Sequence, residues 1–270
     1  MDAAVIEKSK AIRSLVQTAV QSYAVGFEAR HLQELNDPNG TINMKVHNVF
    51  ITVLGPEVQY YSALVRSLDS SLGDMLEGLA IAIAKLCYKV ERKVEGTLSS
   101  QQTSEIARIL EEYRRRAKRP EVKDYVGLVR MRGGGTEAAR HESDYYLQDE
   151  ATGHHYLIEL KIGGDLDNKK ARSEKQALLE QYAILCNTLG SAEKVSVHFA
   201  TAYNRFGEGA PWRQERVRQF FADAELLIGR DFWNFVCKSD TGYDLVLDEY
   251  KKNAGVIVDA LAKVKVAYLG

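Results

Sequence analysis

The stretch HHYLIELKIGGDLDNKK, residues 154–170, carries two opposite charges inside a strongly apolar run. Its first half predicts a β-strand, along which successive side chains point to opposite faces. Leu160 is therefore expected on one face, and Glu159 and Lys161 together on the other. Charges inside a protein cost free energy unless they are paired or hold an ion. A carboxylate and an ammonium group at this position therefore predict either an ion pair or a reactive site.

The segments around this strand predict the fold class. ESDYYLQ, residues 142–148, predicts a second strand, which the turn DEATG joins to the first as a hairpin. Asp167 or Asn168 can cap a helix that reaches about Thr188. KVSVHFAT, residues 194–201, predicts a further strand. Strands and helices in this order indicate an α/β protein with a mixed central sheet flanked by helices.

Helices are expected before and after the sheet. The apolar spacing predicts helices over about residues 68–90 and 102–118, the second of which Pro120 ends. YVGLVRM, residues 125–131, has the composition of a strand, and the chain after the last core strand is expected to be helical. No Gly/Ser-rich linker appears, so a single domain is expected over residues 1–270. Its expected parts are a mostly helical segment (1–120), a catalytic sheet core (121–205) and a helical C-terminal segment (206–270).

The composition is that of an ordinary globular protein, with 45% hydrophobic and 27% charged residues. No apolar run is long enough to cross a membrane, and the charged N-terminus lacks the pattern of a signal peptide. The three cysteines, Cys87, Cys186 and Cys237, lie far apart and form no CxxC pair. We therefore expect reduced thiols in a cytoplasmic protein.

The charge is unevenly distributed, although the formal net charge is only -1. Residues 108–140 contain ten Lys or Arg against five Asp or Glu. Such a basic stripe can follow the phosphates of a nucleic acid. It can equally be the solvated face of a helix, and the sequence leaves both interpretations open.

The candidate catalytic residues are Asp144, Glu159 and Lys161. Asp144 lies on the first hairpin strand, across the turn from the other two. Metal-dependent phosphodiester hydrolysis needs carboxylate oxygens for Mg²⁺ and positive charge near the reacting phosphate. Two acids and a lysine on adjoining strands meet this need. The alternative is an ordinary surface ion pair, which contributes little to stability.

The arrangement Asp144…Glu159-Leu160-Lys161 on a hairpin, followed by a helix and a strand, resembles the PD-(D/E)XK nuclease superfamily. One departure is that ESD stands where the superfamily pattern has a proline before the first acid. More narrowly, about residues 65–270 resemble type II restriction endonucleases of the TdeIII-like group. The runs that carry this second resemblance are ELKIGGDLDNKKARSEKQALLEQYAIL, ATAYNRFGEG, LLIGRDFWNFVC and ALAKVKVAYL.

The resemblance implies a restriction-endonuclease-like core in a cytoplasmic, prokaryotic homodimer. It also implies Mg²⁺-dependent cleavage of double-stranded DNA at a short GC-rich palindrome of the GGNCC kind. Asp144 and Glu159 match the metal-binding acids of the superfamily, and Lys161 matches the catalytic lysine. Many relatives add a glutamate from an N-terminal helix, which Glu77 matches, although a solvent-exposed Glu77 beside Asp74 is the alternative. A repair or recombination nuclease of the same superfamily, and a nucleic-acid-binding module without activity, are the alternative functions.

Arginines are the expected DNA contacts, because their guanidinium groups pair with guanine edges in the major groove. Lys170, at the start of the helix after the catalytic strand, can hold a phosphate. The candidate arginines flank the RGGGT loop or follow the last core strand: Arg130, Arg132, Arg140, Arg205, Arg213 and Arg216.

Overall fold

The structure is a computed structural model. It describes residues 3–131 and 133–270, except for the side chains of residues 136–144. The chain forms two compact units, which we call the helical unit (residues 1–82 and 244–270) and the sheet unit (residues 83–243).

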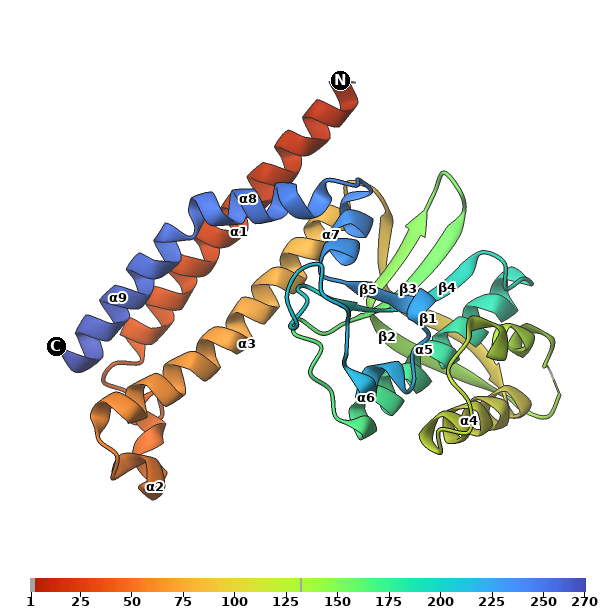
Figure 1. Ribbon diagram of the computed structural model, residues 1–270, viewed down its shortest axis with the longest axis horizontal. Helices are drawn as coiled ribbons and strands as arrows, with labels where there is room; N and C mark the ends of the chain where they lie inside the picture. Colours follow the sequence, from red (N-terminus) through yellow and green to blue (C-terminus); the bar gives the residue numbers. More distant parts are fainter. Residues whose placement is uncertain (1–2, 132) are drawn as a thin grey trace. The chain divides into compact units, whose positions relative to one another are not determined.

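The helical unit packs long helices along one another (Figure 1). Its elements are α1 (Ala3–Gln33), the 3-10 helix η1 (Asn43–His47), α2 (Val49–Thr52), most of α3 (Pro56–Ala84), most of α8 (Gly242–Asn253) and α9 (Gly255–Leu269). On α1, Ile12, Val16 and Val20 are buried at intervals of one helical turn. Phe27 continues the stripe and packs in a core that includes Val264 of α9. The period of the apolar residues thus explains why α1 and α9 lie side by side.

The sheet unit is built on five strands in the order β1-β2-β3-β4-β5. The strands are β1 (Lys89–Ser99), β2 (Thr136–Asp149), β3 (His154–Leu160), β4 (Val195–Thr201) and β5 (Leu226–Ile228). The first three strands pair antiparallel, and β3, β4 and β5 run parallel. The remaining elements are α4 (Ser100–Arg114), η2 (Val122–Asp124), η3 (Val126–Arg130), α5 (Asn168–Leu189), α6 (Glu215–Arg218), η4 (Asp223–Glu225) and α7 (Arg230–Cys237).

Helices cover both faces of this sheet. Leu157 of β3 and Phe199 of β4 lie in one hydrophobic core with α4 and α5. On the opposite face, Phe232 of α7 meets the ring of Tyr145 edge-on, with ring centroids 6.2 Å apart. The mixed central sheet flanked by helices, with a helical N-terminal region, is therefore confirmed.

The hairpin and the helix after it agree with the sequence prediction. β2 and β3 pair in the register Tyr145↔Ile158. Asp167 caps α5, since its carboxylate accepts a hydrogen bond of 2.7 Å from the backbone N–H of Lys170. At the other end of α5, Gly190 has φ 70°, a left-handed conformation that favours glycine.

Three predicted elements were wrong. Residues 125–131 are not a strand but contain the 3-10 helix η3, and its capping residue Tyr125 and its member Leu128 are buried three positions apart. The helix predicted to residue 90 ends at Ala84, and the edge strand β1 begins at Lys89. The C-terminal part is not entirely helical, because residues 226–228 form β5. The helix predicted over about residues 102–118 is α4, which ends at Arg114.

No helix among residues 3–131 and 133–270 is long and apolar enough to cross a membrane. The cysteines Cys87, Cys186 and Cys237 are free thiols, as predicted. Burial raises the pKa of Cys186 to about 11.

Candidate active site

Glu159 and Lys161 lie at the end of β3, on the face that α5 covers. The carboxylate of Glu159 forms an ion pair with the ammonium group of Lys161. A second carboxylate, Glu174 of α5, lies 3.4 Å from the same ammonium nitrogen. The side chains of Glu159, Glu174 and Lys161 are 13%, 26% and 34% exposed, so the group is partly buried but still reached by solvent. Glu159 and Lys161 thus share one face, as the sequence predicted, and Glu174 of α5 meets Lys161 on that face.

The backbone after β3 fixes the position of Lys161. Its N–H donates to the carbonyl of Ala200 at 3.0 Å, which extends the pairing with β4 by one residue. The next turn contains Gly164 at φ +62°, where an added Cβ would lie 2.4 Å from a ring carbon of Trp212. Both the positive φ and this close approach require glycine. The Gly163-Gly164 pair therefore lets the chain turn tightly from the charged strand end into α5.

A buried ion pair fixes α5 beside Glu174. The fully buried ammonium group of Lys175 contacts the carboxylate of Glu225 at 2.5 Å. Glu225 also accepts hydrogen bonds of 2.6 Å from the Tyr125 hydroxyl and 2.7 Å from the backbone N–H of Ala222. Burial lowers the pKa of Lys175, and the negative charge of Glu225 opposes that shift. Because a broken buried pair is costly, this network holds the turn of α5 that carries Glu174.

Asp144 belongs to the backbone of β2, but its side chain lies outside the described part of the structure. Tyr145 pairs with Ile158, and Asp144 and Glu159 are the neighbouring residues on the two strands. The two backbone positions therefore lie at the same level of the hairpin. The metal-binding role of Asp144 remains a prediction.

The donor set at the strand end suits a hard cation. Mg²⁺ prefers oxygen ligands and commonly takes one or two carboxylates from the protein. Glu159 and Glu174 offer such oxygens, and the neighbouring Lys161 balances their charge. Among the side chains that the structure describes, no three His, Cys, Asp or Glu residues form a metal-binding group. Asp144 is not among those side chains.

The segment after β4 is anchored to the loop that follows Glu159 and Lys161. The guanidinium group of Arg205 pairs with the carboxylate of Asp165 at 2.9 Å. The amide of Gln214 donates to the same oxygen at 3.2 Å. Asp165 lies on the loop between β3 and α5, so it ties residues 202–214 to the end of β3. The side chains of Arg213 and Arg216 are exposed beside this loop.

The other predicted site residues are distributed over both units. Arg130 ends η3 and Lys170 lies in the first turn of α5, and both are exposed. Arg132 and the side chain of Arg140 lie outside the described residues. Glu77 lies on α3 in the helical unit and is half-buried. Its expected active-site role remains a prediction.

Glu174 is the residue of this group that sequence reasoning missed. The buried stripe of α5 includes Ala171 and Leu178. Glu174 lies between them, three residues after the first and four before the second, and therefore on the same side of the helix. An acid on the apolar side of a helix that follows a strand with candidate catalytic residues is a signal that could have identified it.

The comparisons with known proteins agree with this geometry. Residues 8–254 match the family model described as "Type II restriction endonuclease, HinfI". Comparisons with curated proteins and with solved structures found no match. The match spans both units, including the hairpin, Glu159, Lys161 and Glu174. The chain therefore belongs to the HinfI family of type II restriction endonucleases.

Proposed function

We propose that the protein cleaves both strands of double-stranded DNA at a short palindromic site in a Mg²⁺-dependent reaction. The observation that carries this proposal is the position of Lys161, which pairs with both Glu159 and Glu174 at the end of β3. A lysine held in this way can stabilise the negative charge that develops during phosphodiester hydrolysis. Family membership makes DNA the substrate.

Each residue of the site has a distinct role in this proposal. Asp144 and Glu159 would hold Mg²⁺, which when bound supplies Lewis-acid activation to phosphate chemistry. Lys161 directs its ammonium group at the phosphate and stabilises the negative charge that develops in the transition state. Glu174 orients Lys161 and adds a third carboxylate to the site. Glu77 is a further candidate ligand, by analogy with relatives that recruit an acid from an N-terminal helix.

Sequence recognition is assigned to the segment after β4. Arg205 is anchored by Asp165, whereas Arg213 and Arg216 extend from the same segment and form no ion pair with any described side chain. An arginine that pairs with guanine is worth about 1–3 kcal/mol of discrimination. We therefore expect alanine at one or more of these three positions to relax the site preference. Arg130, Arg132, Arg140 and Lys170 are assigned to the DNA backbone or its neighbouring bases.

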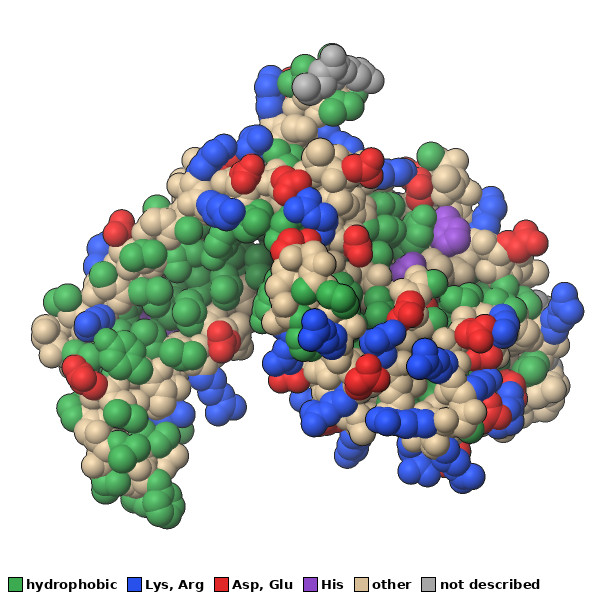
Figure 2. Space-filling model, viewed as in Figure 1, with side chains coloured by type: hydrophobic (Ala, Val, Ile, Leu, Met, Phe, Trp, Pro, Cys, Tyr) green, Lys and Arg blue, Asp and Glu red, His purple; other side chains and the backbone are tan. Residues whose placement is uncertain are grey.

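The protein acts as a homodimer in this proposal, because a two-fold dimer brings one active site to each strand of a palindrome. An apolar lobe on the helical unit favours association with another protein chain. Its six side chains are between 49% and 82% exposed: Met44, Val46, Val49, Phe50, Val53 and Leu54. Figure 2 shows this concentration of apolar side chains over α2 and its surroundings. Contiguous exposed apolar surface of this kind marks interaction sites, and highly charged DNA is a poor partner for it.

The test is digestion of plasmid DNA with Mg²⁺. Discrete fragments support the proposal, a smear indicates a nonspecific repair-type nuclease, and intact DNA that still binds the protein indicates a module without activity. Addition of EDTA should stop cleavage, and persistence of cleavage in EDTA contradicts the metal-dependent site. Sequencing the fragment ends tests the finer expectation from the TdeIII-like resemblance, a GGNCC site.

A further inference from the structure

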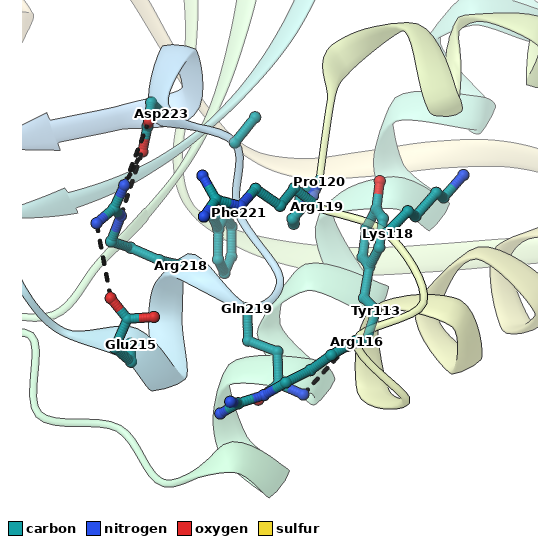
Figure 3. Close-up of a pocket in the computed structure, with 11 residues that line it drawn as sticks. Tyr113, Arg116, Lys118, Arg119, Pro120, Glu215, Arg218, Gln219, Phe221 and Asp223 are labelled. Carbon is teal, nitrogen blue, oxygen red and sulfur yellow. Dashed lines mark hydrogen bonds and ion pairs between the residues drawn. The ribbon is translucent and has the colours of Figure 1, made fainter.

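A cavity of about 410 Å³ lies in the sheet unit, between the end of α4 and the α6–η4 segment (Figure 3). Four cationic and two acidic side chains line it: Arg116, Lys118, Arg119, Arg218, Glu215 and Asp223. The amide of Gln219 donates to the carbonyls of Tyr113 and Arg114 at 3.1 and 3.0 Å. These bonds fasten the two sides of the cavity together. The cavity is therefore a built feature with an excess of positive charge.

Two of the four cations already have partners. Lys118 pairs with Glu112 and Asp124, each at 3.1 Å. Arg218 pairs with Asp223 at 3.2 Å and with Glu215 at 3.6 Å. The remaining two, Arg116 and Arg119, form no ion pair with any side chain that the structure describes. In Figure 3 both guanidinium groups extend from the end of α4 toward the side formed by α6, whereas Lys118 points away.

The backbone of Arg116 is strained in a way that its neighbours are not. Arg116 has φ 55°, in the left-handed region that ordinarily belongs to glycine. It ends α4 in a Schellman arrangement, since its N–H donates to Tyr113 and the N–H of Ala117 to Glu112, both at 3.0 Å. Glycine would make the same helix end at lower conformational cost. An arginine here therefore indicates a use for its side chain, as strained residues often do at binding sites.

The three consecutive arginines at this helix end are not equivalent. Arg114 and Arg115 both pair with Glu111, at 2.7 and 2.6 Å. Only Arg116 turns into the cavity. The other wall of the cavity, α6, directly follows Gln214, which Asp165 holds beside the active site. Lys and Arg side chains also gather over this end of the sheet unit in Figure 2.

We propose that this cavity binds the DNA backbone, with Arg116 and Arg119 each contacting a phosphate. The inference rests on DNA as the substrate. It assigns the contacts to phosphates and not to bases, because the two arginines are charged, line a cavity and have no carboxylate partner among the described side chains. When a guanidinium group with no carboxylate partner neutralises a phosphate, a counterion is released from the DNA. The contribution of that group to the DNA affinity therefore depends on the salt concentration. Arg114 and Arg115, which are already neutralised, contribute less.

The test is DNA binding across a salt series in Ca²⁺, with cognate and non-cognate duplexes of equal length. The variants are Arg116→Gly and Arg119→Ala, and Arg114→Ala is the matched control from the same helix end. Each of the first two should weaken binding to both duplexes about tenfold, as expected for loss of a charge-assisted bond. Each should also reduce the slope of log K against log[salt] by about 0.9. Arg114→Ala should change both quantities less.

Arg116→Gly separates binding from folding. Glycine relieves the left-handed strain, so the midpoint of thermal unfolding should stay the same or rise while DNA binding weakens. Unchanged binding and salt slope in both variants would overturn the phosphate site. So would a loss confined to the cognate duplex, because that pattern belongs to base recognition. Wild-type protein that binds no DNA at all would instead contradict the proposed function.

Discussion

Lys161 is held by carboxylates from two different elements, Glu159 on β3 and Glu174 on α5. Its alkyl chain contributes little to the core, since the side chain is 34% exposed. We therefore expect Lys161→Ala to fold normally and to keep specific binding in Ca²⁺. Cleavage should fall by at least about 100-fold, as when other preorganised transition-state donors are removed. Single-turnover cleavage measures this, and a normal rate in that variant removes Lys161 from the mechanism.

Glu174 permits a second residue-scale prediction. Glu174→Gln keeps the shape of the side chain but removes its charge. Positioning partners of this kind typically change activity or metal affinity by about 10- to 100-fold, so we expect a loss of that size in kcat and in Mn²⁺ affinity measured by calorimetry. Glu180→Gln, on the same helix, is the control. An unchanged metal affinity together with an unchanged kcat would make Glu174 a structural ion-pair partner only.

Sequence reasoning reached Glu159 and Lys161 because charges inside an apolar strand are conspicuous, and a strand fixes which side chains share a face. Glu174 could not be predicted in this way, because its contact with Lys161 depends on how α5 packs on β3. That packing is set by long-range contacts such as Lys175 with Glu225, which no local pattern reveals.

At the scale of elements, β3, β4 and α5 were predictable because their apolar spacing is strong and Asp167 and Gly190 mark the ends of the helix. β1 was not, since it is an edge strand with mostly exposed or half-buried side chains and no clear alternation. η3 was mistaken for a strand, because Tyr125 and Leu128 are apolar residues whose burial depends on tertiary contacts.

His198 on β4 makes the stability of the sheet unit sensitive to pH. Burial lowers its pKa to about 4, with Glu225 opposing the shift and Lys175 and His154 adding to it. Its Nδ1 is buried without a hydrogen-bond partner. The unfolded chain, with a histidine pKa of about 6.5, binds more protons between these values. The stability that the neutral ring contributes is therefore complete above about pH 6.5 and is lost as the pH falls toward about 4.

A comparison of the wild type with His198→Gln isolates this effect, because His31, His154 and His155 titrate in both proteins. Between about pH 7.5 and pH 5, the wild type should lose about 2 kcal/mol more of its free energy of unfolding than the variant does. Urea denaturation at the two pH values measures the difference. Equal losses would show that the His198 pKa is not depressed.

At the scale of the whole molecule, the remaining question is what covers the apolar lobe of the helical unit. Phe50 and Val53 are its most exposed members, at 82% and 80%. Their removal from water on association would be favourable by an amount that grows with the apolar area. A second copy is the partner that the proposed function favours, because a palindromic site would need one cut in each strand and the same lobe on both copies can form a two-fold interface.

We therefore expect the wild type to sediment as a dimer of the 30.3 kDa chain, and Phe50→Ser/Val53→Ser to sediment as a monomer at the same concentration. The control is Val25→Ser/Val258→Ser, which removes two valines exposed by 69% and 63% elsewhere in the helical unit. It should leave the dimer intact. The monomeric variant should also lose concerted double-strand cleavage and leave nicked plasmid, since one active site then meets the DNA at a time. A dimer that survives the Phe50/Val53 change contradicts this interface, and a wild type that is monomeric both free and on DNA contradicts the dimer itself.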